Sequence, residues 1–177
     1  IVLVQGGCIV DRFQSLMNAG AHIPAFITQL TGISNAMVRA APDAGEVMRE
    51  ASRFVGDTPM VAHNASFDRK FWMGELSRLG QQARQPFACT MLLSRRLYPQ
   101  APNHRLGTLV DYHRLPRTGT AHRALADAEM AAELLVRIQQ DLQRRYGVTA
   151  ADHDLLMALQ QCQRQGVSAL LSRYARV

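Results

Sequence analysis

Two short segments, far apart in the chain, carry acidic and imidazole side chains that could do chemistry together. In residues 63–71, HNASFDRKF, Asp68 follows an apolar run. In residues 122–128, HRALADA, His122 and Asp127 stand five positions apart among alanines. Carboxylates bind hard divalent cations such as Mg²⁺ and Mn²⁺, and a neutral imidazole can take up a proton near neutral pH. Side chains of these types could activate a water molecule for hydrolysis.

The first segment also has a purely structural explanation. Asn64 or Ser66 can cap a helix that begins here. Asp68 then lies in the first turn of that helix, where the helix dipole favours a negative charge. On the functional interpretation, Asp68 is instead a metal ligand that projects from a strand-to-helix junction.

The second segment has the same two explanations. His122 and Asp127 could be solvent-exposed residues at the start of a long helix, with no role in chemistry. In a regular helix, five steps of about 100° would point the two side chains roughly 140° apart. They reach one site only if His122 belongs to the preceding loop or to a fraying first turn. The alanines at 124, 126 and 128 leave room for a close neighbour.

The strands that must position these segments are predicted from apolar runs and turn residues. Residues 1–5 and 8–17 are expected to form two strands joined by a two-glycine turn, because glycine accepts positive φ. Residues 59–63, PMVAH, are nearly all apolar, which is typical of a central buried strand. FACT, residues 87–90, predicts a further short strand.

Helices are predicted where apolar residues recur at helical spacing between proline or glycine residues. The expected helices are a short turn after Pro24, an amphipathic piece at 33–40, and segments near 42–55, 64–79, 91–98, 105–113, 124–146, 155–159 and 167–174. In the 64–79 helix, the residues expected to share the buried side are Phe67, Phe71, Leu76 and Leu79. In the 124–146 helix, the buried candidates are Leu125, Ala128, Leu135, Ile138 and Leu142.

A hairpin followed by alternating helices and short strands predicts an α/β fold, with a mixed sheet flanked by helices. Active sites in such folds gather at the carboxyl ends of strands. The length of 177 residues predicts one domain with its own core. No apolar run approaches the roughly 20 residues that span a bilayer, and no signal peptide is recognisable. We therefore expect a cytoplasmic protein with no membrane partner.

The charge and the cysteines narrow the class of protein further. A formal net charge of +6 gives a basic surface, which favours a polyanionic partner such as nucleic acid. Cys8, Cys89 and Cys162 are odd in number and widely spaced, as expected of reduced thiols and not of a disulfide framework or zinc site. At least two of them are expected to pack in the core.

Together, the two segments resemble the second and third motifs of a known enzyme family. HNxxFD after a strand and HxAxxDA opening a late helix are similar to motifs of the DEDDh 3′-5′ exonucleases, within the ribonuclease H-like superfamily. The stretch FQSLMNAGAHIPAFITQLTGISNAMV, with LTGI at residues 30–33, also resembles this family. The resemblance covers roughly residues 1–142. The sequences LTGI and HRALADA are most similar to those of the proofreading epsilon subunit of bacterial DNA polymerase III.

The resemblance implies a ribonuclease H-like mixed sheet flanked by helices, from which the N-terminal strand is missing. Residues 1–142 are then an exonuclease domain that is incomplete at its N-terminus. Residues 143–177 carry no recognisable motif and are expected to form a C-terminal helical extension packed on that domain.

The implied activity is 3′-5′ hydrolysis of phosphodiester bonds in DNA, or in RNA, with release of nucleoside monophosphates. The family chemistry uses two divalent ions, Mg²⁺ or Mn²⁺, which neutralise charge on the attacking and leaving oxygens. By resemblance, His122 is the general base, and Asp68 and Asp127 are metal ligands.

The resemblance also implies partners. The substrate is the 3′ end of single-stranded DNA or RNA, and the residues expected to touch the terminal nucleotide are Thr31, Gly32 and Asn64. A DNA polymerase subunit, or further domains of the same gene product, would be the protein partners.

The sequence departs from the family at the first motif, a D-x-E pair on the first strand. Only two acidic pairs have that spacing: Asp127 with Glu129, on the third-motif helix, and Asp152 with Asp154, expected at a helix N-terminus. We therefore expect the D-x-E pair upstream of Ile1, and we expect the 177 residues alone to be inactive. The alternative is a catalytically inactive module with the exonuclease fold that binds nucleic acid or a replication partner.

Overall fold

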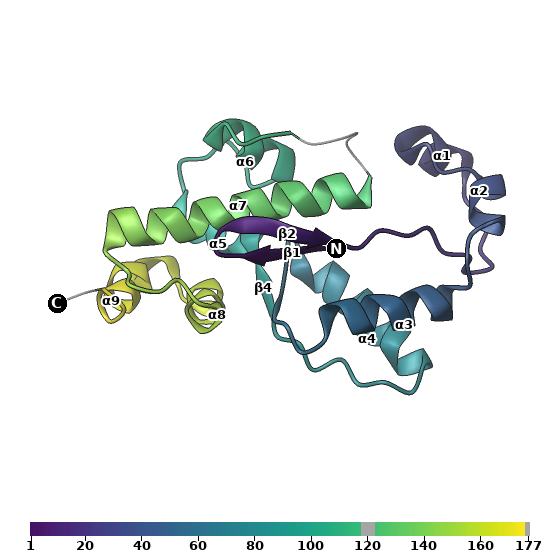
Figure 1. The fold of residues 1–177 in the computed structure, drawn as a ribbon. Coiled ribbons are helices and arrows are strands. Elements are labelled where there is room, and N and C mark those ends of the chain that lie inside the picture. The colour runs from purple at the N-terminus through teal and green to yellow at the C-terminus, as the bar shows by residue number, and fades with distance from the viewer. Residues whose placement is uncertain (118–122, 176–177) are drawn as a thin grey trace.

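The structure is a computed structural model, and it describes residues 1–117 and 123–175. The described elements, in chain order, are β1 (Val2–Gln5), β2 (Cys8–Arg12), α1 (Ala25–Thr31), α2 (Asn35–Arg39), α3 (Ala44–Val55), β3 (Met60–Ala62), α4 (Ala65–Arg78), β4 (Phe87–Cys89), α5 (Thr90–Leu97), α6 (Leu106–His113), α7 (Ala124–Tyr146), α8 (His153–Gln161), η1 (Arg164–Gly166) and α9 (Val167–Ser172). The mixed α/β class predicted from the sequence is confirmed, with helices around short strands (Figure 1).

The predicted hairpin forms where the two glycines allow it. Gly6 and Gly7 have φ of 59° and 79°, and β1 pairs antiparallel with β2 on either side of them. The second strand ends at Arg12, earlier than predicted, because the chain beyond Phe13 leaves the hairpin. The hairpin lies against α7, with the end of β2 directed toward the beginning of α7 (Figure 1).

The other two strands pair in parallel, with Met60 opposite Phe87. Among the described residues, β1–β2 and β3–β4 form two separate two-stranded sheets, and both sheets contact α7. The prediction that PMVAH is a central buried strand is wrong in one respect, since the residues of β3 are only half-buried while those of β4 are fully buried. Each of the two strands has one partner strand in the described part of the chain, but α8 also packs on β4.

The prediction for the buried side of α4 is also wrong. Trp72 and Leu76 are buried, whereas Phe67 and Phe71 are 61% and 55% exposed. Nine helical steps of about 100° place Phe67 opposite Leu76, so the two side chains cannot share a face. The exposed rings instead pack on each other, with centroids 4.8 Å apart.

The longest helix, α7, has the bounds that the sequence predicts, and it ends at Gly147 with φ of 65°. Leu135, Ile138 and Leu142 are buried as expected, whereas Leu125 and Ala128 are half-buried. The buried face of α7 joins α5, α6, α8 and α9 in one apolar cluster. A second cluster holds α3 and α4 against β4.

The C-terminal helices cover the edge of β4. The Gln160 side chain, from α8, accepts a hydrogen bond from the Cys89 N–H at 2.7 Å and donates one to the Phe87 carbonyl at 3.1 Å. One amide thus pairs two backbone groups that a neighbouring strand would otherwise pair. In α9, Val167 and Leu171 are buried in the same cluster as α7.

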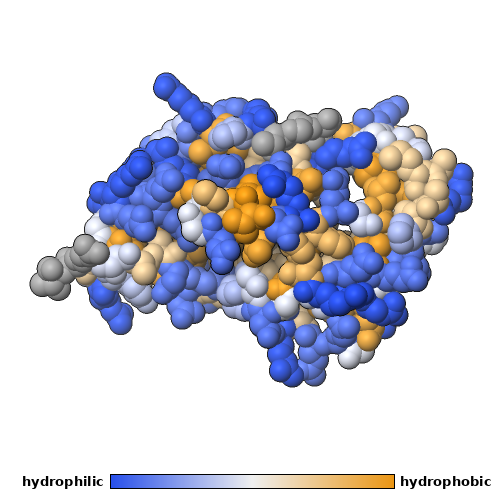
Figure 2. All heavy atoms as spheres, in the orientation of Figure 1, coloured by the Kyte–Doolittle hydropathy of each residue, from blue (hydrophilic) through white to orange (hydrophobic). Residues whose placement is uncertain are grey.

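The α1–α2 arm, residues 25–39, lies beside the body and buries little. Val38 is the one buried residue of these two helices, whereas Phe26 and Leu30 are exposed. Apolar atoms are visible over this arm and around the hairpin in the space-filling view (Figure 2). Within the described ranges, none of the helices has the length and apolar character of a membrane-spanning segment. All three cysteines are free, as predicted.

Candidate active site

The second motif occupies a tight turn between β3 and α4. Asn64 is the N-cap residue of α4, as predicted, but its side chain makes no capping hydrogen bond. Its backbone is left-handed, with φ of 66°, a conformation that asparagine tolerates better than most residues with a Cβ. The turn therefore delivers α4 directly from the carboxyl end of β3 and leaves the exposed Asn64 side chain free to meet a ligand.

His63, in the same turn, ties three segments together. Its Nε2 lies 3.0 Å from the His104 carbonyl, and its Nδ1 lies 2.9 Å from the Thr90 hydroxyl. Because a carbonyl only accepts, Nε2 carries the proton, and in the neutral ring Nδ1 accepts from Thr90. Burial lowers the pKa of His63 and favours that neutral form. His63 thus fixes the strand ends that carry the second motif, a role the sequence did not indicate beyond its position directly after a strand.

Asp68 lies in the first turn of α4, as the sequence predicts. Its side chain is exposed, yet the surrounding protein shields the carboxyl from water and raises its pKa, partly offset by a hydrogen bond from its own backbone N–H. This position of Asp68 is compatible both with a role at the helix dipole and with a role as a metal ligand. An exposed carboxylate beside a strand end is available to a cation.

The third motif opens α7. Asp127 is half-buried in the first turn, and its N–H donates to the Arg123 carbonyl at 3.1 Å. Arg123 is the N-cap residue, and its side chain makes no capping bond. The predicted general base, His122, lies outside the described residues.

The LTGI turn lies close to the start of α7. Gly32 has φ of 69°, and a Cβ placed on it would lie 3.2 Å from the Arg123 guanidinium. The Thr31 hydroxyl donates to the Ile27 carbonyl at 2.8 Å and accepts from the Ile33 N–H at 3.1 Å. The structure therefore brings the LTGI turn close to the start of the third-motif helix. It also shows that the Thr31 hydroxyl closes the turn at the end of α1.

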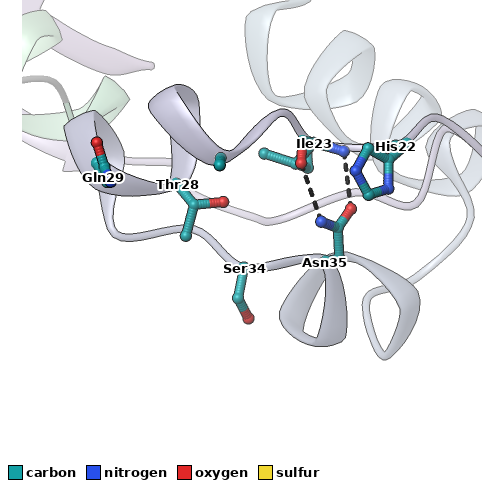
Figure 3. A pocket seen from close by; sticks show the side chains of 7 residues that line it. His22, Ile23, Thr28, Gln29, Ser34 and Asn35 are labelled. Carbon is teal, nitrogen blue, oxygen red and sulfur yellow. Dashed lines mark hydrogen bonds between the residues drawn. The ribbon is translucent and has the colours of Figure 1, made fainter.

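A shallow hollow of about 420 Å³ lies between α1 and α2 (Figure 3), lined by His22, Ile23, Ala25, Thr28, Gln29, Ser34 and Asn35. The Asn35 amide accepts from the Ile23 N–H at 2.7 Å and donates to the Ile23 carbonyl at 2.9 Å, which holds the loop before α1 onto α2 (Figure 3). Thr31 and Gly32 do not line the hollow, so it is not the predicted nucleotide contact.

The donors fit a hard divalent cation in kind. Asp68 and Asp127 lie in the first turns of two helices, α4 and α7, that both contact β3. In residues 1–117 and 123–175, however, three or more His, Cys, Asp or Glu side chains do not gather into a metal-binding group. The other acidic pair is structural, as predicted: Asp152 caps α8 by accepting from the Leu155 N–H at 2.9 Å, and Asp154 lies in its first turn.

Comparisons with known proteins agree with this arrangement. The family model described as "Exonuclease" matches residues 1–135. The DNA polymerase III subunit epsilon of Aquifex aeolicus is 36% identical over 148 residues, covering 83% of this chain and 73% of that protein. The PolC-type DNA polymerase III of Bacillus subtilis is 39% identical over 142 residues, which are 79% of this chain and 10% of that protein. The chain thus spans about a tenth of the PolC-type relatives it matches.

A solved structure shares the fold. Exonuclease X in complex with 5′ overhanging duplex DNA matches with a TM-score of 0.63 and 24% identity, over 96% of this chain and 87% of that chain. The match extends past residue 135, where the family model ends, and so includes C-terminal helices.

Proposed function

Since the chain belongs to the exonuclease family, as a DEDDh-type relative of the polymerase III epsilon and PolC exonucleases, we propose that it is the catalytic domain of a 3′-5′ exonuclease acting on DNA. The observation that carries this proposal is the pairing of its two motifs. They lie in the first turns of two helices that both contact the same short strand, β3. RNA remains a second substrate, because discrimination depends on contacts to the 2′-OH.

The residues have distinct parts in the proposed reaction. Asp68 and Asp127 hold divalent ions, which exonucleases of this family generally use. We propose Mg²⁺ or Mn²⁺, because these cations prefer carboxylate oxygens. Two such ions supply charge neutralisation for the attacking and leaving oxygens. His122 takes the proton of the attacking water. Asn64, Thr31 and Gly32 border the terminal nucleotide, and the Thr31 hydroxyl shapes that border through the turn it closes.

Exposed aromatic rings, two of them on the same helix as Asp68, support a single-stranded substrate. Phe67 precedes Asp68 directly, and Phe71 follows one turn later on the same exposed side of α4. Phe26 is 67% exposed on α1. Stacking of a base on such a ring is worth about 1–3 kcal/mol and tolerates any base. The net charge of +6 adds attraction for the phosphate backbone.

The 177 residues supply only part of the acidic set. Two carboxylates are too few to fix two ions, so we propose that these residues alone do not hydrolyse DNA. The first-motif acids would come from elsewhere in the natural polypeptide. A DNA polymerase subunit, or polymerase domains on the same polypeptide as in the PolC-type relatives, is the proposed partner, and the cytoplasm is the proposed location.

The test is a nuclease assay with Mn²⁺ on the longest natural polypeptide that contains this chain. We expect a 5′-labelled single strand to shorten one nucleotide at a time, with mononucleotides released. Asp127→Asn removes several kcal/mol of transition-state stabilisation, so kcat/KM should fall about a thousandfold. The kcat/KM of Asp68→Asn and of His122→Ala should fall by a comparable factor.

Asp154→Asn is the matched control, because Asp154 is also a first-turn helix acid but belongs to α8. It should change kcat/KM little. Equal losses in Asp154→Asn and Asp127→Asn would contradict the assignment. Absence of any nuclease activity in the natural polypeptide would favour the second candidate, an inactive nucleic-acid-binding module, which the incomplete acidic set supports.

A further inference from the structure

An ion pair links the end of the hairpin to the third-motif helix. The Arg12 Nε donates to a Glu129 carboxylate oxygen at 2.6 Å, and the two residues are 117 positions apart in sequence. Arg12 is the last residue of β2, and Glu129 lies two residues after Asp127 on α7. The Glu129 side chain is 13% exposed and the Arg12 side chain is 49% exposed, so the carboxylate is mostly covered by protein while the guanidinium is half-exposed.

Within residues 1–117 and 123–175, the first turn of α7 has no side-chain capping hydrogen bond. The Arg123 side chain does not cap the helix, so the N-terminus lacks the hydrogen bond that usually fixes it. Ala126 and Met130 are buried and define the side of α7 that faces the core. Contacts of the side chains on either side of this buried face limit the rotation of the helix about its axis.

Asp127 and Glu129 occupy opposite flanks of this buried side. Two helical steps of about 100° separate them by roughly 200°. The ion pair between Arg12 and Glu129 therefore fixes the rotation of the first turns about the helix axis. That rotation determines the direction in which the Asp127 side chain projects. We propose that Arg12 and Glu129 form a positioning pair that aims the Asp127 carboxylate. This inference rests on the proposed function, because it assigns Asp127 to the metal site.

The pair should affect the site more than the fold. Ion pairs with a half-exposed partner contribute little to the free energy of unfolding. A displacement of about 1 Å in a catalytic group can nevertheless cost about a hundredfold in rate. The expected signature is thus a large loss of activity with a small loss of stability.

The test compares Arg12→Glu, Glu129→Arg and the double charge swap in the longest natural polypeptide. Each single variant should lower kcat about tenfold to a hundredfold and raise the Mn²⁺ concentration needed for half-maximal activity. Amide hydrogen exchange over residues 124–130 should accelerate, since the helix start loses its anchor. The double swap should restore exchange protection and most of the activity.

A matched ion pair provides the control. Arg78 and Glu75 are joined at 2.7 Å on the last turn of α4, and reversing them should change neither kcat nor exchange in α7. The inference is overturned if the Arg12 and Glu129 variants behave like the Arg78→Glu control, or if the double swap is no better than the worse single variant. Asp127→Asn separates the two claims. If that variant stays active, the proposed function fails, whereas if it is inactive while Arg12→Glu is normal, only the positioning role fails.

Discussion

The two ends of α7 are built differently. At the C-terminal half, Asp141 is buried and accepts a hydrogen bond from the Tyr98 hydroxyl at 2.9 Å. Arg137 and Arg145 complete its surroundings, with nitrogen–oxygen distances of 3.1 and 3.4 Å. At the N-terminal end, the helix has no side-chain cap, and Asp127 is half-buried beside the predicted site.

This difference separates stability from chemistry along one helix. A buried acid whose charge is satisfied on several sides holds one geometry but is closed to ligands. A partly exposed acid at an uncapped helix start is open to a cation, and it needs support from outside the helix. We expect substitutions at the C-terminal half to change the free energy of unfolding, and substitutions at the N-terminal end to change catalysis.

The largest stability effect is expected from Leu142→Ala. Leu142 is fully buried in the apolar cluster that α7 shares with α5, α6, α8 and α9, so truncation removes apolar contacts and leaves a cavity. We expect a loss of about 2–5 kcal/mol in the free energy of unfolding, measured by urea denaturation. Leu30→Ala, at a residue that is 50% exposed, is the control and should cost far less. A fall in kcat of Leu142→Ala well below its unfolding transition would show that the two ends are not separable.

A smaller effect is expected from Tyr98→Phe. The substitution keeps the ring but removes the hydroxyl that donates to Asp141. Burial of Tyr98, followed by the hydrogen bond to Asp141 and the charge of Asp141, raises the pKa of that hydroxyl. Loss of that bond should cost about 1–3 kcal/mol, because the buried acceptor is left with fewer partners. Tyr112→Phe, on the surface of α6, should change stability by less than about 0.5 kcal/mol. Equal midpoints of urea denaturation for the two variants would mean that the hydrogen bond to Asp141 does not stabilise the C-terminal half of α7.

The smallest effect is a pH dependence at the buried end. His113 packs edge-on against Tyr98, and burial, with help from Arg137, lowers its pKa. The unfolded chain therefore binds a proton more readily than the folded one, so stability is complete above about pH 6.5 and falls as pH drops toward the lowered value. Burial lowers the pKa of His63 and His153 in the same direction.

The measurement is the thermal midpoint between pH 7.5 and pH 5, values chosen to bracket the ordinary histidine pKa of about 6.5. His113→Phe should make the decline shallower, because it removes one of the described imidazoles whose pKa is lowered by burial. His22→Asn, at an exposed position, should leave the slope as it is. A midpoint that rises on acidification would have the wrong sign for buried neutral histidines.

Local patterns predicted the elements well. The bounds of α7 follow from its apolar spacing and from Gly147, and the hairpin follows from its two glycines. The sequence prediction failed in α4, which carries aromatic residues on more than one side. Helical steps already separate Phe67 from Leu76, but only tertiary packing decides that the side with Trp72 is the buried one.

Long-range polar contacts were beyond sequence reasoning. The Arg12–Glu129 pair joins residues 117 positions apart. Gln160 forms hydrogen bonds with the backbone of β4, and it belongs to a helix in which the sequence shows no motif. Of the candidate site, the sequence placed Asp68 in the first turn of its helix, which the structure confirms. Asp127, expected near the start of the long helix, lies in the first turn of α7. Their roles as metal ligands, and the role of His122, stay predictions.

The central claim is that the beginning of α7 binds metal while its C-terminal half only stabilises. It is tested most directly by titrating Mn²⁺ into the longest natural polypeptide and following free Mn²⁺ by electron paramagnetic resonance. We predict that Asp127→Asn weakens Mn²⁺ binding at least tenfold, in line with the loss of a charged ligand, while Leu142→Ala binds as the unsubstituted protein does. Unchanged Mn²⁺ binding in Asp127→Asn would contradict the account.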